Sequence, residues 1–341
     1  MTSCGVVDGV VTLGHGGGGR LTHELVARHF GAGAAAGARL DDAARLDVAD
    51  ARLAFTTDSF VVTPRFFPGG DIGRLAVCGT VNDLACMGAR PVALSAAVVI
   101  EEGLAEEELA RVAQSMSAAC DEAGVRVVTG DTKVVERGSA DGLFITTSGV
   151  GVVREGIELS GSGARAGDAV LVSGPVGQHG LAVMVARHGL ASLHGIESDC
   201  APLWGLVERL LEEVGGAVHV LRDPTRGGLA ASLNEIAEQS QVRVVLDVPS
   251  GIVTGAVGGA CELLGLDPLT LASEGRLVVV VDGAACEQAL SVLRAHPQGR
   301  GSIQIGQVVD GGGAARVTLA TVLGTERVLD MPTGELLPRI C

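Results

Sequence analysis

The sequence predicts an α/β (α+β) protein with two domains and a flexible C-terminal tail. Runs rich in β-branched residues alternate with segments of helical periodicity, which is typical of this class. At 341 residues the chain exceeds the ~100–200 residues of a usual domain. A polar, glycine-rich stretch, "EGIELSGSGARAGD", interrupts the alternation near the middle. We therefore expect domains over residues 1–155 and 156–323 and a tail over 324–341.

The first half contains the patterns of several strands and two helices. "LGHGGGGRLTHELVARHF" reads as a loop leading into a helix with Thr22 as its N-cap. "AEEELARVAQSMSAACDEAG" has the apolar spacing of an amphipathic helix, an acidic first turn and a terminal Gly124. The β-branched stretches "LAFTTDSFVV", "PVALSAAVVI", "VRVVTGD" and "GLFITTSGVGVV" predict strands.

The alternation resumes in the second half. We expect strands at residues 169–174, 218–221, 243–248, 276–281, 303–308 and 316–322, and helices near 180–189, 201–214, 228–239, 255–265 and 284–296. From Gly324 onward the periodicity ends, and the remaining segment is long enough to extend ~55 Å. This reach would allow the chain end to enter a distant cleft.

Composition and charge exclude several functional classes. Hydrophobic residues make up 47% of the chain and aromatic residues only 2%, so we expect a core of Ala, Val and Leu. The formal net charge of −15 argues against nucleic-acid binding, because phosphate contacts require a basic surface. No apolar run reaches the ~20 residues that span a bilayer, and the N-terminus lacks a signal pattern. We expect a cytoplasmic protein that does not bind membranes.

The chain ends in a cysteine, Cys341, beside its own terminal carboxylate and two residues after Arg339. The eight cysteines are scattered without a C-x-x-C pair, and most are expected to be reduced and structural. Cys341 cannot be packed as an ordinary core residue, because the segment before it is punctuated by proline and glycine. It is either a chance surface thiol or a functional one.

A single lysine, Lys133, stands among 24 arginines. A compact ammonium differs in chemistry from the planar guanidinium, so this position favours a role that arginine cannot fill, although a chance survivor remains an alternative. Asp131 lies two residues earlier, and alternate residues of a strand share one face. The pattern therefore places an acid beside the only lysine.

Other polar positions fit phosphate and cation chemistry. Gly16–Gly19 precede a helix and could converge their amides on an anion, but the run is not a Walker loop and a linker is an equal alternative. Asp58, Asp83 and Asp131 are predicted to end strands or open loops and offer the oxygen ligands that suit Mg²⁺, although each alone is an ordinary turn residue. Glu274 precedes a strand, where a solvated carboxylate is the simpler interpretation.

Seven motifs along the whole chain resemble one family, in order. They are "GHGGGGR", "NDLACMGARP", "GDTKVV", "SGPVGQHG", "DPTRGGLA", "ASEG" and the terminal "PRIC". The pattern is similar to that of the HypE family, the carbamoyl dehydratases of [NiFe]-hydrogenase maturation, within the ATP-using aminoimidazole ribonucleotide synthetase superfamily. The internal motifs are shared with the superfamily, whereas the terminal "PRIC" is specific to HypE. One departure is a glycine where the family loop carries a serine, which puts one hydroxyl contact to phosphate in doubt.

The resemblance implies a homodimer of two-domain subunits that binds ATP and Mg²⁺ near the dimer interface. A HypF-type partner would place a carbamoyl group on Cys341, and ATP would drive its dehydration to a thiocyanate. The cyano group would then pass to iron on a HypC–HypD complex, as the cyanide ligand of the hydrogenase centre.

The resemblance also implies roles for individual residues. Mg²⁺ would bind Asp58, Asp83 and Asp131, with Lys133 neutralising the transferred phosphoryl group and Glu274 acting as the base. Nucleotide contacts would come from Gly16, Gly17, Gly18, Gly19, Asn82, Asp83 and Thr132.

Two alternatives stay open from the residues. The chain could be a non-catalytic carrier of a thiol-bound group, which ATP turnover would distinguish from an enzyme. It could also be another ATP-dependent member of the superfamily. Selenophosphate synthetase, however, requires a reactive residue near the N-terminus followed by lysine, and here Cys4 is followed by Gly5 and Val6.

Overall fold

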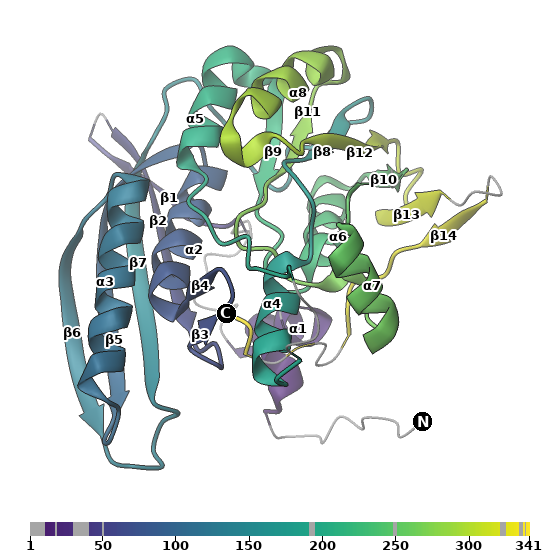
Figure 1. The fold of residues 1–341 in the computed structure, drawn as a ribbon. Coiled ribbons are helices and arrows are strands. Elements are labelled where there is room, and N and C mark those ends of the chain that lie inside the picture. Colours follow the sequence, from purple (N-terminus) through teal and green to yellow (C-terminus); the bar gives the residue numbers. More distant parts are fainter. Residues whose placement is uncertain are drawn as a thin grey trace.

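The computed structural model describes residues 11–17, 19–29, 41–49, 51–190, 195–247, 251–320, 325–333, 337 and 339–341. The chain forms two sheets, each with helices packed on it, and the C-terminus lies between them (Figure 1). The first sheet ends with residue 153 and the second begins with residue 169. The polar stretch that was expected to separate two domains connects these sheets.

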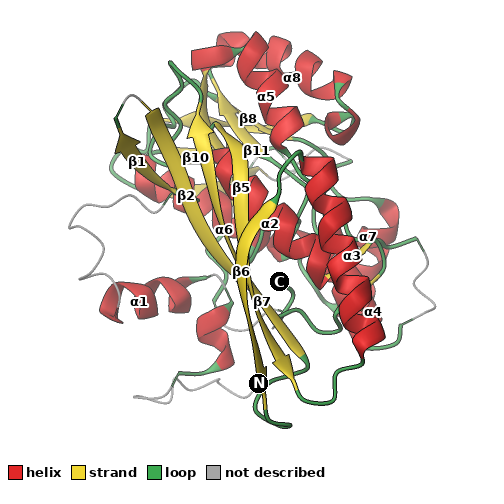
Figure 2. Ribbon diagram, turned by 90° about the vertical axis from the view of Figure 1, so that its left-hand side faces the viewer, coloured by secondary structure: helices red, strands yellow, loops and turns green. Residues whose placement is uncertain are grey.

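The first sheet has five strands in the order β1-β2-β7-β5-β6. All neighbours pair antiparallel except β5 and β6, which are parallel. Helices α2 and α3 pack together on one side of it (Figure 2). The bounds are β1 Ala44–Val48, β2 Ala51–Phe60, β5 Ala89–Glu101, β6 Val127–Val135, β7 Leu143–Val153, α2 Ile72–Cys86 and α3 Glu106–Ala123, and a small hairpin consists of β3 Phe66–Phe67 and β4 Gly70–Asp71.

The second sheet has seven strands in the order β14-β13-β10-β12-β8-β11-β9. Alternate residues of its central strands enter two separate apolar clusters, with α6 on one face and α5 and α8 on the other. A sheet buried on both faces requires the nearly continuous valine and leucine runs that this half contains. The bounds are β8 Ala169–Val172, β9 Val218–Arg222, β10 Arg243–Leu246, β11 Val278–Val281, β12 Ile303–Val309, β13 Arg316–Ala320, β14 Glu326–Val328, α4 Gln178–Arg187, α5 Trp204–Glu213, α6 Gly228–Ser240, α7 Gly255–Leu264 and α8 Cys286–Ala295.

Most predicted elements are confirmed, including every strand and helix predicted after residue 168, with end shifts of a few residues. Helix α3 ends as predicted, with Gly124 in the left-handed conformation at φ 68°. Helix α1 (Arg20–His29) begins before Thr22, so the prediction of Thr22 as N-cap is wrong. The Thr22 hydroxyl instead donates to the carbonyl of His15 at 2.8 Å.

Helix α2 was not predicted, and its character explains why. Nearly all of its residues are buried, so it carries no polar face and no amphipathic period. It begins at Asp71, whose carboxylate accepts from the amides of Gly73 and Arg74 at 2.7 and 3.2 Å. Asp83 therefore lies within a helix, and the prediction that it ends a strand or opens a loop is wrong.

The C-terminal segment is partly structured. Residues 326–328 form β14, which extends the second sheet beyond the predicted start of the tail by pairing with β13. The last residues lie against the segment that follows β2. The amide of Val61 donates to the terminal carboxylate of Cys341 at 3.0 Å, and the amide of Thr63 donates to the carbonyl of Arg339 at 3.2 Å. Mobility of the tail stays a prediction.

None of the helices in the described ranges combines the length and apolar character that a bilayer span requires.

Candidate active site

Four aspartates meet between the two sheets. Asp58 comes from β2, Asp83 from α2, Asp42 from the segment before β1 and Asp223 from the loop after β9. Burial is the main cause that raises the pKa of every one of them, and repulsion from neighbouring carboxylates adds to it for Asp42, Asp83 and Asp223. For Asp42 the pKa rises to about 6. Buried carboxylates are stable in their charged form only when a cation compensates them, so this cluster is a candidate cation site.

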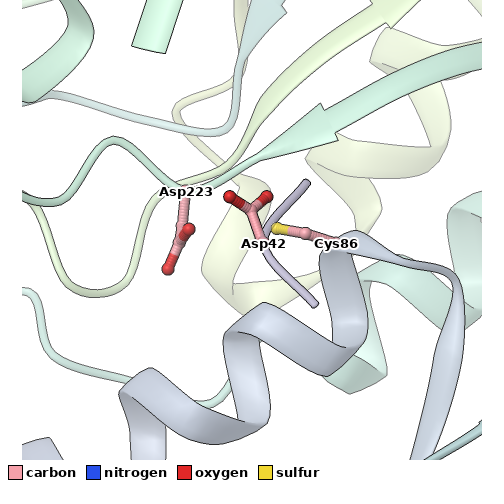
Figure 3. A group of neighbouring side chains, drawn as sticks. All are labelled: Asp42, Cys86 and Asp223. Atoms are coloured by element: carbon pink, nitrogen blue, oxygen red, sulfur yellow. The ribbon is translucent and has the colours of Figure 1, made fainter. Parts of the chain in front are cut away.

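Part of this cluster has the spacing of a metal site (Figure 3). Ligand atoms of Asp42, Cys86 and Asp223 all lie within 4.8 Å of one another. The Oδ2 atom of Asp223 is buried without a hydrogen-bond partner, which is costly unless an ion or water completes it. Carboxylate oxygens suit Mg²⁺ whereas the thiol does not, so the residues fit Mg²⁺ through their carboxylates.

Cationic side chains border the cluster on the side of α6. The Nε atom of Arg222 lies 3.1 Å from Asp42, and its guanidinium also binds Glu235. Glu235 contacts His23 at 3.1 Å and raises the pKa of that imidazole. Together with Asp223, Thr225 and Arg226 these residues line a pocket of about 180 Å³. A small polar pocket of this kind suits phosphate groups better than an apolar ligand.

Glu274 is buried at 2% exposure, and its Oε1 atom has no hydrogen-bond partner. Burial, followed by the charges of Asp223 and Asp58, raises its pKa well above the usual range, which makes its carboxylate a stronger base. Its backbone is fixed from both sides, because its amide donates to Asp199 at 3.1 Å and its carbonyl accepts from Asn82 at 3.2 Å.

The predicted role of Asn82 in binding the nucleotide does not match its contacts. Its amide group donates to the carbonyls of Ala201 and Glu274 and accepts from the amide of Leu203 at 2.8 Å. The side chain is fully buried and both its donor and acceptor groups are engaged with backbone of the second domain. Asn82 therefore joins the two domains and holds Glu274 in place.

The Cys341 thiol lies in this site. Burial raises its pKa to about 12, while Arg226 lowers it and Glu274 and Asp58 raise it. Arg339 is directed elsewhere: its guanidinium donates to the carbonyl of Val61 at 2.8 Å and lies over the ring of Phe144. The cation that acts on the thiol is thus Arg226, although Arg339 is the arginine nearest to Cys341 in the sequence.

Asp131 and Lys133 do not join the cluster within one chain. They share one face of β6 as predicted, and Lys133 Nζ lies 2.6 Å from Asp131. The register, however, places Asp131 one row away from the row of Asp58, and neighbouring rows of a pleated sheet point to opposite faces. One row consists of Asp58, Thr147, Ala96 and Gly130. The neighbouring row consists of Ser59, Thr146, Ala97 and Asp131.

The predicted metal ligands point to opposite faces of the first sheet. Asp58 faces α2, whereas Asp131 and Lys133 face away from it. The prediction that Asp58, Asp83 and Asp131 of one chain hold a single ion is wrong for this arrangement. Thr132 is exposed, and its amide donates to the carboxylate of Asp131 at 2.9 Å.

The glycine loop approaches the site from the first residues described. Gly16 ends a short 3₁₀ helix, and its carbonyl accepts from Arg226 at 3.2 Å. Gly17 follows it, and a side chain at Gly19 would collide with the carbonyl of Pro332, 2.2 Å from the position of a Cβ atom. Gly18 lies outside the described residues. The glycine loop therefore contacts Arg226, the arginine whose charge lowers the pKa of the Cys341 thiol.

Several residues of the site were not predicted individually. Asp223 and Arg226 lie in "DPTRGGLA", and His179 in "SGPVGQHG", which were recognised as family motifs without a role for these residues. Asp42 and Arg222 lie in none of the recognised motifs. Only the folded structure shows that their side chains form an ion pair. A larger groove of about 900 Å³, lined by Arg52, Arg154, Trp204 and other residues, contains none of the predicted site residues.

Comparison with known proteins agrees with this architecture. Residues 40–153 match the family described as AIR synthase related protein, N-terminal domain, and residues 165–318 match its C-terminal domain. The chain is 50% identical over 336 residues to carbamoyl dehydratase HypE of Bradyrhizobium diazoefficiens, covering 98% of this chain and 97% of that protein. It is 44% identical over 338 residues to HypE of Escherichia coli, covering 97% and 99%.

Solved structures give the same result. A HypE structure in complex with ATP superposes with a TM-score of 0.82 at 48% identity, covering 97% of this chain and 100% of that one. The HypE–HypF complex gives a TM-score of 0.85 at 47% identity, covering 92% and 100%. A thiamine monophosphate kinase at 18% identity, with a TM-score of 0.63, shares the fold alone. The chain therefore belongs to the HypE family of AIR synthase-related proteins.

Proposed function

We propose that the protein is an ATP-dependent carbamoyl dehydratase that acts on a carbamoyl group carried by its own Cys341. The observation that carries this proposal is the docking of the last residues, whose backbone is hydrogen-bonded to His179 and Val61 and whose thiol is within electrostatic range of Arg226, Glu274 and Asp58. A thiol delivered by the chain end can carry a group into such a site. The relatives named carbamoyl dehydratase HypE support the same reaction.

The chemistry follows from what each group can do. The carbonyl oxygen of the thiocarboxamide attacks the γ-phosphate of ATP, ADP departs, and the oxygen becomes part of a phosphate leaving group. Loss of this phosphate and of the two N–H protons turns S–C(O)–NH₂ into S–C≡N. Glu274 is the candidate base, since it is unpaired, has a raised pKa and lies near the thiol. Arg226 would offset the negative charge that develops at the transferred group.

Mg²⁺ would be held by carboxylates of the cluster that comprises Asp42, Asp58, Asp83 and Asp223. When bound, it would neutralise the phosphate charge of the nucleotide. The chain itself supports this assignment through the raised pKa values of all four groups and the unpartnered oxygen of Asp223.

A homodimer would give Asp131 and Lys133 a place in the reaction. Both project from the face of the first sheet opposite to α2, and Leu46, Val48 and Phe55 project from the same face with 46%, 53% and 44% exposure. An exposed apolar sheet face of this kind is typical of a subunit interface. Across such an interface Lys133 of one subunit could reach the nucleotide of the other.

The proposed partners follow from the family. The HypE–HypF complex supports a HypF-type carbamoyltransferase as the source of the carbamoyl group. The thiocyanate would be delivered to a HypC–HypD complex.

Intact-mass spectrometry tests the proposal. After treatment with HypF, carbamoyl phosphate and ATP, the C-terminal peptide should gain one carbamoyl group. Further ATP and Mg²⁺ should then remove the mass of one water from that peptide, and Cys341→Ala should bind ATP yet gain no adduct. A carbamoyl adduct that never loses water would identify a carrier instead, and an adduct on another cysteine would overturn the assignment of Cys341.

A further inference from the structure

The C-terminal residues are held mainly through their backbone. The carbonyls of Arg339 and Ile340 and the terminal carboxylate of Cys341 each accept a hydrogen bond from the body of the protein. Arg187 donates to the first at 2.7 Å, His179 to the second at 2.6 Å, and the amide of Val61 to the third at 3.0 Å. Of these donors, the imidazole of His179 binds the peptide unit that directly precedes Cys341.

His179 belongs to a chain of hydrogen bonds whose directions are determined by chemistry. The carbonyl of Ile340 can only accept, so Nε2 of His179 must carry the proton. In the neutral imidazole Nδ1 is then an acceptor, and it lies 2.8 Å from the hydroxyl of Ser198. The amide of Cys200 donates to the same hydroxyl oxygen at 3.1 Å, which leaves the Ser198 hydrogen free for His179.

The surroundings keep the imidazole in this state. His179 is fully buried and meets the edge of the Phe67 ring at a centroid distance of 5.3 Å. Burial lowers its pKa, so the ring is neutral at neutral pH. Ser198 is itself fixed, because its amide donates to the carbonyl of Pro68 at 2.8 Å. Phe67 and Pro68 belong to the first domain and Ser198 to the second, so this arrangement forms where the two domains meet.

We propose that His179 is a positioning residue for Cys341, and that Ser198 selects the imidazole tautomer that binds the Ile340 carbonyl. The inference rests on the proposed function, in which Cys341 carries the reacting group. His179 does not touch that group but fixes the peptide unit before it. Displacement of a reacting group by 1 Å can cost about 10²-fold in rate, so this anchor would matter for dehydration.

Alkylation of Cys341 measures the position of the tail without any nucleotide or carbamoyl donor. The docked thiol has a pKa of about 12 and should react slowly with iodoacetamide at pH 8, whereas a released tail should expose an ordinary thiol. Loss of the hydrogen bond in His179→Leu should accelerate alkylation of the C-terminal peptide by up to about tenfold, the factor that corresponds to ~1.4 kcal/mol.

Two further variants distinguish positioning from general packing. His179→Gln retains both a donor for Ile340 and an acceptor for Ser198, so its alkylation rate should stay within about threefold of wild type. Ser198→Ala should fall between wild type and His179→Leu, because the tautomer is no longer selected. The control is His219→Gln, which replaces another buried imidazole, bound to Asp168 at 2.8 Å, and should leave Cys341 unchanged.

The same variants are then compared in single-turnover dehydration. His179→Leu should accept the carbamoyl group at the wild-type rate and lose water about 10- to 100-fold more slowly, with partial recovery in His179→Gln. An alkylation rate in His179→Leu equal to that of wild type would overturn the inference. So would an alkylation rate in His179→Gln as fast as that in His179→Leu. If the Leu variant does not fold, unchanged alkylation in Ser198→Ala would do so. Failure of wild-type dehydration would count against the proposed function alone, since alkylation does not depend on it.

Discussion

Arg226 and the thiol of Cys341 are electrostatic partners. Cys341 is the largest cause of the raised pKa of Arg226, and Arg226 is the cation that lowers the pKa of the thiol. Burial outweighs this attraction, because the thiol pKa still rises to about 12. A docked Cys341 is therefore neutral and a weak nucleophile. We infer that this position suits a thiol that already carries its group.

Replacement of Arg226 tests its role in the second half of the reaction. Arg226→Gln should slow dehydration of carbamoylated protein by about 10²- to 10³-fold, because one preorganised positive charge is removed from the transferred group. Carbamoyl loading should change little. Arg243→Gln, which removes an arginine of β10 that is paired with Glu326 of β14, is the matched control. A single-turnover mass time course measures both steps, and equal water loss in the two variants would contradict the assignment.

The aspartate cluster predicts an unusual dependence of stability on pH. Each carboxylate has a pKa that is higher in the folded than in the unfolded protein, so the folded state binds more protons. This contribution to stability is fully present below about pH 4 and is lost as pH rises through the folded pKa, which is about 6 for Asp42. The denaturation midpoint in EDTA should therefore fall between pH 5 and pH 7, and Mg²⁺ with ATP should reduce that fall.

Asp223→Asn should separate metal binding from stability. Asp223 raises the pKa of Asp83 and Glu274, so removal of its charge relieves repulsion and should raise the melting temperature of the metal-free protein by ~2–4 °C for each kcal/mol gained. The further stabilisation by Mg²⁺ should be lost or require at least about tenfold more metal. Asp47→Asn, at a carboxylate with 89% exposure, is the control. A Mg²⁺ response equal to wild type would exclude Asp223 as a ligand.

The elements of the fold were largely predictable, because strands and amphipathic helices have periodic patterns. Helix α2 was not, since a helix buried on all sides lacks such a period. Among the candidate site residues, Asp58, Asp83 and Glu274 are brought close enough to interact electrostatically. The opposite orientation of Asp131 could not be predicted, because it depends on the register of four strands. The pairing of Asp42 with Arg222 joins distant parts of the chain and leaves no local signal.

The exposed face of the first sheet allows assembly to be tested separately from catalysis. Phe55→Glu should convert a dimer to monomers, because a charge would be buried against the apolar partner face. Leu263→Glu, at a residue with 75% exposure on α7, should leave the mass unchanged. Light scattering after gel filtration measures both variants. A wild-type monomer, or a Phe55→Glu dimer, would contradict this interface.

Lys133→Arg should retain the fold and the proposed dimer but lose most dehydration. The planar guanidinium is larger than the ammonium and would misplace the contact to the phosphoryl group. Lys133 is exposed and contacts Asp131 in this chain, so the substitution requires no repacking of a core. Single-turnover rates equal to wild type would show that the only lysine of the chain is dispensable.

An extension of the C-terminus tests how closely the site fits the chain end. The terminal carboxylate of Cys341 accepts from the amide of Val61 and its thiol is desolvated, so residues added after Cys341 would have to displace this hydrogen bond. A C-terminal tag should therefore slow dehydration strongly and accelerate alkylation of Cys341, because docking is lost. An N-terminal tag that stays clear of Gly16–Gly19 should be tolerated. Equal dehydration by the two tagged proteins would mean that the thiol reacts without the docked arrangement, and the roles inferred for Arg226 and Glu274 would then have to be reassigned.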